Sequence, residues 1–557
     1  MGDAGVIMLV KPMRSLCRLP VIVAAGLLLL GLAARPGGTE GLTGTTAADQ
    51  PDVEIAQRLA VPGPLAVEGI LLDRAALLAV YQSRQNRPIW AGYPGWPAAL
   101  ETAIAASDRD GIPPESLGLA SLQRALGDQA LGSADRDLLL TDRFLAYGAA
   151  LARGRVDMAS IDPLWALPAP IFDPVAAVAR LESAGGPAPA LQAMVPDSAD
   201  YDRLRGALAR YEAIAATGGW EILSPSTNLR LGDQGPGVQL LRRRLAAEGG
   251  LAADLAENPS FDLGLEAAVN SFQSRHGLLV DGHVGPTTVA ALNLTAADRA
   301  RQIRINLERL RASPHAYPAT RIEVQQASQM LTFYRDGKPV LVSRVVVGAP
   351  LHPTPVLEAV VERVVLDPAW DVPASIIRNE IRPRLARDPG YLARNHYVVR
   401  GDNGLRQLPG PWNALGSVML DMPNPFDVYL HDTPMQKFFA LPQRALSHGC
   451  VRVEAVRELA GDLLGAPLPP PGSGPTRGVA LAAPMPVYFL YQTAFAAADG
   501  TVEFRDDIYG RDARLAGVLA GVDQGPAEAW APALSRAVPA DAKSCPEIAA
   551  NLAELRP

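Results

Sequence analysis

The part of this sequence best suited to covalent chemistry is a cysteine that follows two short histidine-containing stretches. His431 lies in Tyr429-Leu430-His431-Asp432, and Cys450 closes Ser447-His448-Gly449-Cys450. A thiol becomes a nucleophile when a neighbouring imidazole takes its proton and pairs with the thiolate. A glycine before the cysteine permits a tight bend and leaves backbone N–H groups to face a developing oxyanion. The stretch therefore supplies a nucleophile, a base and hydrogen-bond donors, which is what acyl transfer needs.

The residues before His431 predict the element that positions it. Apolar and polar side chains alternate over residues 426–430, which is typical of a strand. Side chains alternate across a strand, so Val428 and Leu430 would share one face while Tyr429 and His431 share the other. We therefore expect His431 to point where a substrate can reach it. Such a base also needs a third group to orient its ring, and we expect the backbone carbonyl of Asp432 to do so.

Two other interpretations fit the same residue types. A single cysteine is most often a small buried hydrophobe. Two histidines and one cysteine in one short span could also bind zinc, because both residue types are zinc ligands. The length and order of the whole string favour catalysis over both.

The string resembles the signature of the L,D-transpeptidases of bacterial cell walls, in which a His precedes a Ser-His-Gly-Cys motif. The resemblance implies that Cys450 is the nucleophile and His431 its base. It implies that His448 and Gly449 shape the oxyanion hole with the Cys450 N–H, and that Ser447 supports the loop.

Together with Ser447, two further residues are candidates for substrate binding. Tyr429 shares the face of His431 on the predicted strand. Arg452 stands where the family keeps a polar residue near the donor peptide, and its alternative role is a structural ion pair. We expect no cofactor and no metal.

The chain is 557 residues long, which predicts about three or four domains rather than one core. We expect a multidomain α+β protein whose catalytic domain is β-rich, of the sandwich or barrel-like kind. The predicted segments are a signal peptide or membrane anchor (1–35), a linker (36–51), a helical scaffold (52–227), a peptidoglycan-binding module (228–295), a bridging helix (296–317), the catalytic domain (318–468), a Pro/Gly-rich loop (469–483), C-terminal strands that complete the catalytic domain (484–524) and a tail (525–557).

The N-terminus has the layout of a secretory signal. Lys11, Arg14 and Arg18 precede an apolar run over residues 19–34. We expect export to the periplasm, with the segment either cleaved or kept as an inner-membrane anchor. Cleavage would leave Cys450 and Cys545; we expect no disulfide between them, because a nucleophilic thiol must stay reduced.

The helical part has two portions that resemble modules of the larger Gram-negative members of the family. Tyr81…Arg84…Pro88-Ile89-Trp90 resembles their N-terminal helical part. There we expect a helix over 136–152, with Asp135, Asp137 and Asp142 on a solvated face. The second portion resembles the three-helix peptidoglycan-binding module, with apolar stripes at Val238, Leu241 and Leu245 and at Val269 and Phe272. It either binds or positions glycan, or is purely structural.

Residues 376–408 form a charged insertion inside the β-rich region. Long insertions beside active sites are often lids. In relatives of this size the insertion resembles a capping subdomain over the thiol. Its alternative interpretation is a solvated helix.

The net charge of −7 and the pI near 5.6 provide no electrostatic reason to expect nucleic acid as a partner. The resemblance implies acyl transfer from a tetrapeptide stem through a Cys450 thioester to an amine of another stem, giving cross-links between third-position residues. The expected partners are peptidoglycan stem peptides and glycan, together with cell-wall synthesis enzymes. Hydrolysis of the thioester, or its transfer to the Lys of an outer-membrane protein, remain open, as does a non-enzymatic wall-binding protein.

Overall fold

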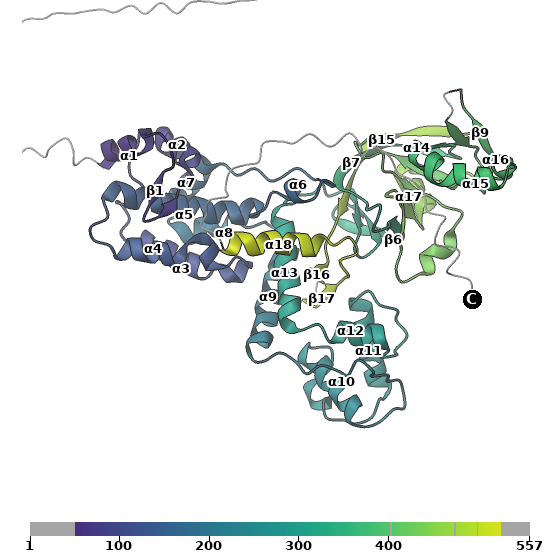
Figure 1. The fold of residues 1–557 in the computed structure, drawn as a ribbon, viewed down its shortest axis with the longest axis horizontal. Helices are drawn as coiled ribbons and strands as arrows, with labels where there is room; N and C mark the ends of the chain where they lie inside the picture. Colours follow the sequence, from purple (N-terminus) through teal and green to yellow (C-terminus); the bar gives the residue numbers. More distant parts are fainter. Residues whose placement is uncertain (1–50, 402–403, 473–474, 498, 525–557) are drawn as a thin grey trace, which may run out of the picture. The chain divides into compact units, whose positions relative to one another are not determined.

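A computed structural model describes residues 51–401, 404–472, 475–497 and 499–524 (Figure 1). The expected signal segment, nearly all of the expected linker, Cys17, the tail and Cys545 lie outside these ranges. Within them, every helix is too short or too polar to traverse a lipid bilayer.

The N-terminal half is mostly helical and packs around one core. Helix α5 (Ser133–Arg153) runs through that core, and apolar residues on all its sides are buried. The other elements here are α1 (Pro51–Ala60), β1 (Ala66–Val67), β2 (Ile70–Leu71), α2 (Arg74–Ser83), α3 (Trp96–Ala105), η1 (Ser107–Asp110), η2 (Pro114–Leu117), α4 (Leu119–Gly127), α6 (Met158–Ile161), β3 (Trp165–Ala166), α7 (Pro174–Ser183) and α8 (Pro187–Gln192).

The expectation of a solvated acidic face on α5 is wrong for Asp137 and Asp142, which are both buried. The Asp137 carboxylate accepts hydrogen bonds from the Tyr81 hydroxyl and from the backbone N–H groups of Ile89 and Trp90. A buried carboxylate is tolerated when its oxygens are hydrogen-bonded in this way. The Tyr81-to-Trp90 motif therefore fixes a loop against α5.

The peptidoglycan-binding-like module consists of α10 (Pro236–Ala247), η3 (Ala253–Leu255), α11 (Leu263–Arg275) and α12 (Pro286–Leu292). Both predicted stripes are buried in its core, as expected: Val238, Leu241 and Leu245 from α10, and Val269 and Phe272 from α11. The module is followed by α13 (Ala296–Arg311), which starts at a capping box between Thr295 and Asp298. Helix α13 packs on α9 (Ala199–Ala216).

The β-rich region, which the sequence predicts to be the catalytic domain, is a closed barrel of strands. Among the described residues the sheet runs in the order β11-β12-β14-β6-β5-β4-β15-β7, and β11 also pairs with β7, which closes the ring. Closure leaves no open edge between these strands. The strands are β4 (Arg321–Gln325), β5 (Met330–Arg335), β6 (Lys338–Gly348), β7 (Val356–Leu366), β11 (Val418–Asp421), β12 (Leu430–His431), β14 (Val451–Val453) and β15 (Arg477–Leu490), with β13 (Ala445–Ser447) beside β6 and β3 beside β7.

Local sequence explains much of this barrel. Buried and less buried residues alternate along β4 and β5. Asp336 and Gly337 both have positive φ, +52° and +77°, as a tight β-hairpin turn between β5 and β6 requires. Residues 477–483, expected in a loop, instead belong to β15, because this long strand pairs with β7 on both sides of a register shift (Figure 1).

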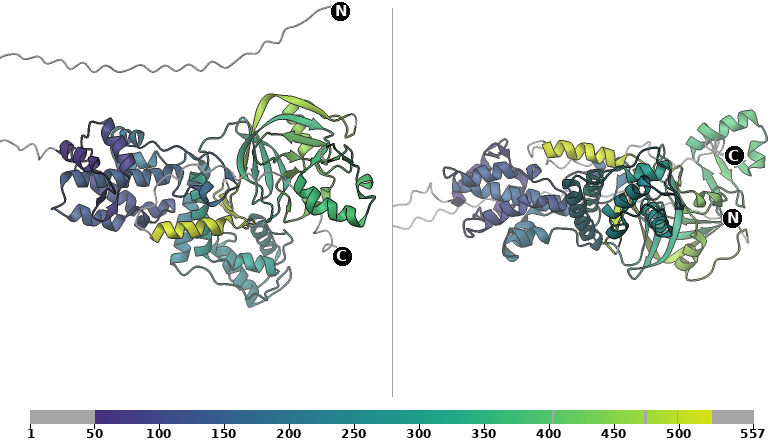
Figure 2. Two further views of the ribbon diagram at one scale, coloured as in Figure 1. Left: turned by 45° about the horizontal axis from the view of Figure 1, so that its top comes forward. Right: turned by 90° about the horizontal axis from the view of Figure 1, so that it is seen from below.

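The insertion carries its own small core, built from Trp370, Val372, Ile376, Ile381 and Leu405 with Leu415. Its elements are β8 (Trp370–Val372), α14 (Ala374–Ile376), the π-helical turn η4 (Ile377–Ile381), α15 (Arg382–Arg387), α16 (Tyr391–Arg394), β9 (Tyr397–Val399) and β10 (Leu405–Gln407). The three strands pair in the order β8-β10-β9. Figure 2 shows the insertion's helices projecting from one end of the barrel.

The C-terminal segment completes the barrel only through β15. The hairpin of β16 (Ala494–Ala496) and β17 (Val502–Phe504) packs instead with α9 and α13. Residues 511–524, expected among strands, form α18 (Arg511–Gln524). The remaining elements are η5 (Gln436–Ala440) and α17 (Val456–Leu464).

Candidate active site

Strand pairing brings His431 and Cys450 together. Strands β12 and β14 pair in parallel, with His431 opposite Arg452 and Leu430 opposite Val451. Paired residues of neighbouring strands, about 4.8 Å apart, project to the same face. Cys450 lies two residues before Arg452, so alternation puts it on the face of Arg452 and His431. The predicted base therefore ends β12, and the predicted nucleophile directly precedes the adjacent strand β14.

The strand predicted over residues 426–430 is mostly a loop, and only Leu430 belongs to β12. Asp427 has a left-handed backbone (φ +52°), which interrupts an extended strand. The Asn424 side-chain oxygen accepts from the N–H groups of Phe426 and Val428 and so replaces the ladder hydrogen bonds. The expectation that His431 is accessible is also wrong, since its side chain is buried.

His431 has the hydrogen bond expected of an oriented base. Its Nδ1 lies 2.5 Å from the carbonyl oxygen of Asp432, as predicted. A carbonyl only accepts, so Nδ1 carries the proton and Nε2 keeps its lone pair. Burial, with a smaller effect of the Arg452 charge, lowers the pKa of His431 to about 3. The ring is therefore neutral and able to take a proton at Nε2.

The loop before Cys450 is held by buried hydroxyl groups. Ser447 Oγ donates to the carbonyl of Cys450 and accepts from the N–H of Gly449. Thr354 Oγ1 donates to the Gly449 carbonyl over 2.8 Å. Gly449 has φ +112°, which a residue with a Cβ rarely adopts. Because its N–H already bonds Ser447, Gly449 contributes the bend rather than a free oxyanion donor.

His448 is buried in the same loop. Its ring stacks on His352, with centroids 4.5 Å apart. Burial, followed by the charges of His352 and Arg452, lowers the pKa of His448 to about 2. Its Nε2 lies 3.1 Å from a carboxylate oxygen of Glu380 in the insertion.

The structure describes Cys450 as disulfide-bonded. The other two cysteines of the chain, Cys17 and Cys545, lie outside the described residues. The expected absence of a disulfide between Cys450 and Cys545 stays a prediction, because Cys545 is not among the described residues. A sequence does not show which cysteines come within bonding distance, since that depends on the folded path of the chain. As a disulfide, the sulfur must be reduced before it can act as a nucleophile.

The two predicted substrate-binding residues flank the pair. Tyr429 is half-buried, and its ring meets that of His431 edge-on at 5.6 Å. Arg452 is buried, and its guanidinium lies 5.7 Å from the ring centre of Phe438. Its charge acts on both histidines.

Three contributors were missed from the sequence: Thr354, His352 and Glu380. The role of Thr354 depends on a contact with a residue 95 positions away in the chain. Glu380 carries no local pattern that sets it apart from other charged residues of the insertion. Only the folded chain shows that Glu380 contacts His448.

A cavity of about 280 Å³ lies beside Asp432, the residue that follows His431. Its lining includes Gly410, Gly416, Asp432 and Thr433. Within the described ranges no three His, Cys, Asp or Glu side chains are grouped as metal ligands would be.

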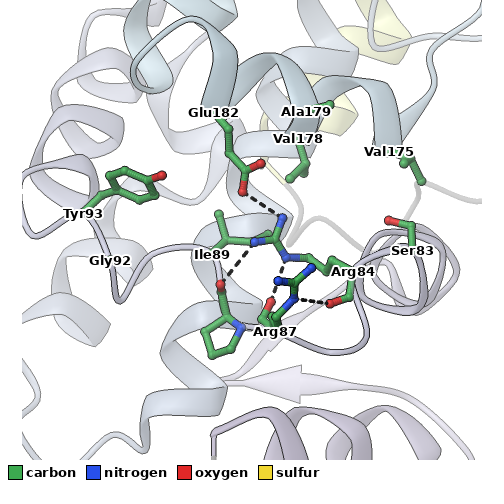
Figure 3. Close-up of a pocket in the computed structure, with 11 residues that line it drawn as sticks. Ser83, Arg84, Arg87, Ile89, Gly92, Tyr93, Val175, Val178, Ala179 and Glu182 are labelled. Carbon is green, nitrogen blue, oxygen red and sulfur yellow. Dashed lines mark hydrogen bonds and ion pairs between the residues drawn. The ribbon is translucent and has the colours of Figure 1, made fainter.

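A larger cavity, of about 600 Å³, lies in the helical region between α2 and α7 (Figure 3). Arg84 projects into it, forms an ion pair with Glu182 at 2.9 Å and donates to the carbonyl of Arg87. Tyr93, at its rim, stacks on Trp96 with ring centres 3.6 Å apart. None of its lining residues belongs to the Cys450 loop.

Comparison with known families agrees with the barrel and its loop. Residues 319–476 match the family model described as "L,D-transpeptidase catalytic domain" (YkuD). These residues are similar to an L,D-transpeptidase catalytic domain. Residues 75–208 match a "Scaffold domain", and residues 234–292 match a "Putative peptidoglycan binding domain". The signature and both helical modules thus resemble the families expected from the sequence.

A curated protein of Haemophilus influenzae named "Putative L,D-transpeptidase" is similar to part of this chain. It is 31% identical over 245 residues, which cover 39% of this chain and 49% of the relative. The chain therefore matches about half of that relative's length.

Solved L,D-transpeptidases are also similar. One from Xylanimonas cellulosilytica is 18% identical, with 48% of this chain and 100% of that chain covered at a TM-score of 0.18. One from Stackebrandtia nassauensis is 15% identical, with 48% and 97% covered at a TM-score of 0.20.

Proposed function

We propose that the protein is a cysteine-dependent peptidoglycan L,D-transpeptidase. The observation that carries the proposal is the pairing of β12 with β14, which sets an oriented His431 beside Cys450 inside the L,D-transpeptidase domain. The substrate is the tetrapeptide stem of peptidoglycan. The product is a cross-link between third-position residues of two stems.

The first half-reaction forms a thioester. His431 Nε2 takes the proton of the reduced Cys450 thiol, and the thiolate attacks the carbonyl of the third stem residue. The tetrahedral oxyanion collapses and breaks the bond to the terminal D-alanine. Its amine leaves with the proton that His431 returns. This use of one imidazole as base and then acid fits a ring held by a single carbonyl at Nδ1.

The second half-reaction resolves the thioester. An amine of another stem attacks the same carbonyl, gives its proton to His431 and displaces the Cys450 thiolate, which is then reprotonated. The Cys450 N–H and the His448 ring are the proposed oxyanion donors. Each such donor contributes on the order of 3 kcal/mol to the transition state.

The peptidoglycan-binding-like module and the N-terminal segment fit a protein that acts on a cell-wall substrate. The peptidoglycan-binding-like module would keep the catalytic domain near glycan. Export to the periplasm, and either cleavage or anchoring of the N-terminal segment, belong to the same proposal. Water or the Lys of an outer-membrane protein could resolve the same thioester, and product analysis on purified wall fragments distinguishes these acceptors.

Intact-mass spectrometry after incubation with a carbapenem, a drug class that acylates this family's thiol, tests the proposal. After treatment with a phosphine reductant, we expect one adduct per chain that maps to Cys450. Without reductant we expect none, because the sulfur is bonded.

Cys450→Ser and His431→Ala should remain unmodified after reduction. His283→Ala, a histidine of the peptidoglycan-binding-like module, serves as the matched control and should be acylated like the wild type. A folded, reduced wild type that forms no adduct would contradict the proposal and favour a wall-binding protein.

A further inference from the structure

Glu380 connects the insertion to the reactive loop. Its carboxylate Oε1 lies 3.1 Å from Nε2 of His448. The Glu380 side chain is 19% exposed and that of His448 is 6% exposed, so this contact is shielded from water. Charges interact more strongly in such surroundings than at an open surface.

The backbone around Glu380 is unusual. Glu380 lies in the π-helical turn η4, between α14 and α15. Short π-helical turns are rare and occur frequently at functional sites, because the wider turn re-aims the side chains that it carries. The next residue, Ile381, is buried in the insertion's core, which anchors the turn.

The His448 ring has a second nitrogen whose partner is missing. Its Nδ1 is buried and has no hydrogen-bond partner among the described residues. A buried polar atom without a partner is energetically costly, and a catalytic role is one of the explanations for such an atom. His448, which carries this nitrogen, lies two residues before Cys450.

The groups around His448 have opposite effects on the protonation of its ring. His352, stacked on the ring, and Arg452 on β14 disfavour a proton on His448. Glu380 is the carboxylate in contact with the ring, and it favours a proton there. Arg384 lies 3.7 Å from the other oxygen of Glu380 and competes for its charge.

We propose that Glu380 is a positioning residue for His448, and that it holds the ring so that Nδ1 faces the oxyanion. The inference rests on the proposed function. The negative charge of Glu380 beside Nε2 of His448 favours the imidazolium form of the ring as the oxyanion develops. A proton on Nδ1 of His448 can then be donated to the negative oxygen. The proton comes from solvent and returns there when the thioester forms.

The geometry also assigns a role to the insertion. The insertion provides the carboxylate, and the barrel loop provides the imidazole. Hydrogen bonds between catalytic groups are often poorly aligned before substrate binds and tighten in the complex. A closed insertion would align the Glu380 carboxylate with Nε2 of His448. The rate of acylation would then depend on the position of the insertion.

The test is the kinetics of carbapenem acylation of the reduced full chain, separated into an affinity and a maximal rate constant. Glu380→Gln keeps the shape of the side chain and removes its charge. We expect its maximal rate constant to fall about 10–100-fold, as for loss of support to one oxyanion donor, with the affinity little changed. Glu380→Asp keeps the charge and should retain more of the rate than Glu380→Gln.

Asp388→Asn is the matched control, because Asp388 is a carboxylate of the same insertion that pairs with Arg394. It should react like the wild type. Circular dichroism must show that each variant is folded.

Wild-type rates in folded Glu380→Gln, or a loss confined to affinity, would overturn the inference while leaving the proposed function intact. Equal loss in Glu380→Asp and Glu380→Gln would also overturn it, because charge would then not matter. Failure of the wild type to form any adduct would instead contradict the proposed function itself.

Discussion

Thr354 has a single buried hydroxyl that joins the end of β6 to the reactive loop before Cys450. It accepts from the N–H of Gly348 over 2.9 Å and donates to the Gly449 carbonyl over 2.8 Å. Thr354→Val keeps the side-chain volume but leaves both backbone groups buried and unpaired. We expect a loss of about 2 kcal/mol in the free energy of unfolding and slower acylation, because Gly449 is no longer held.

Urea unfolding and carbapenem acylation of reduced protein measure the two effects. Thr354→Ser keeps the hydroxyl and serves as the control, with smaller losses in both. A Thr354→Val variant as stable and reactive as the wild type would show that the hydroxyl does not hold the loop.

At this scale the sequence predicted the residues whose chemistry is local. The spacing of His431 and Cys450, and the carbonyl of Asp432 as the orienting group, follow from types and neighbours along the chain. Glu380 could not be predicted, because its contact with the loop depends on how a long insertion folds back.

Helix α11 ends in a buried histidine that joins two elements. His276 stacks on Phe272 of α11, with ring centres 3.8 Å apart, and on Phe504 of β17 at 5.6 Å. Burial, followed by the Arg299 charge, lowers the pKa of His276 to about 3. The helix therefore docks on the β16–β17 hairpin through a neutral ring.

This docking predicts a pH dependence of stability. The folded pKa is lower than the unfolded value of about 6.5, so the unfolded chain binds the extra proton between these values. The contribution is present above pH 6.5 and is lost as the pH falls toward 3. From pH 7 to pH 5 we expect this histidine alone to lower the free energy of unfolding by about 2 kcal/mol.

His276→Asn keeps a donor near Nδ1 and removes the titration. Urea unfolding of the full chain at both pH values, with hydrogen exchange of α11, should show a smaller loss for the variant. Equal losses in wild type and variant would mean that His276 does not remain neutral.

Element prediction succeeded where the pattern was regular. The hairpin at Asp336 and Gly337 and the stripes of α10 and α11 follow from turn chemistry and periodicity. Residues 426–430 alternate like a strand, yet the left-handed Asp427 and the Asn424 side chain turn them into a loop. Residues 477–483 follow a Pro/Gly-rich run that suggests a loop, and pairing with β7 extends β15 through them instead.

At the scale of the whole molecule, three distant segments meet at one side chain of α18. The buried Arg511 guanidinium forms an ion pair with Asp162 at 2.6 Å. It also donates to the side chain of Gln326, after β4, and to the carbonyl of Thr354, each over 3.1 Å. The helical half, the barrel and the reactive loop are thus tied to one residue near the C-terminal end of the described chain. No sequence pattern indicates this junction, because its partners lie up to 349 residues apart.

Arg511→Met tests whether that junction supports the site. It leaves the Asp162 carboxylate buried without its cation, which typically costs about 3–5 kcal/mol. We expect a lower melting temperature and slower acylation, since Thr354 also loses a partner. Arg514→Met, on the exposed side of the same helix, should leave both unchanged.

Adding Asp162→Asn to Arg511→Met distinguishes an unpaired charge from lost packing. If the buried charge dominates, the double variant recovers most of the stability, because a neutral amide is cheaper to bury than a carboxylate. Acylation should stay slow in that variant, since the hydrogen bond to the Thr354 carbonyl is still absent. Recovery of both stability and rate would instead mean that Arg511 acts on the site only through Asp162, and that the contact with Thr354 is incidental.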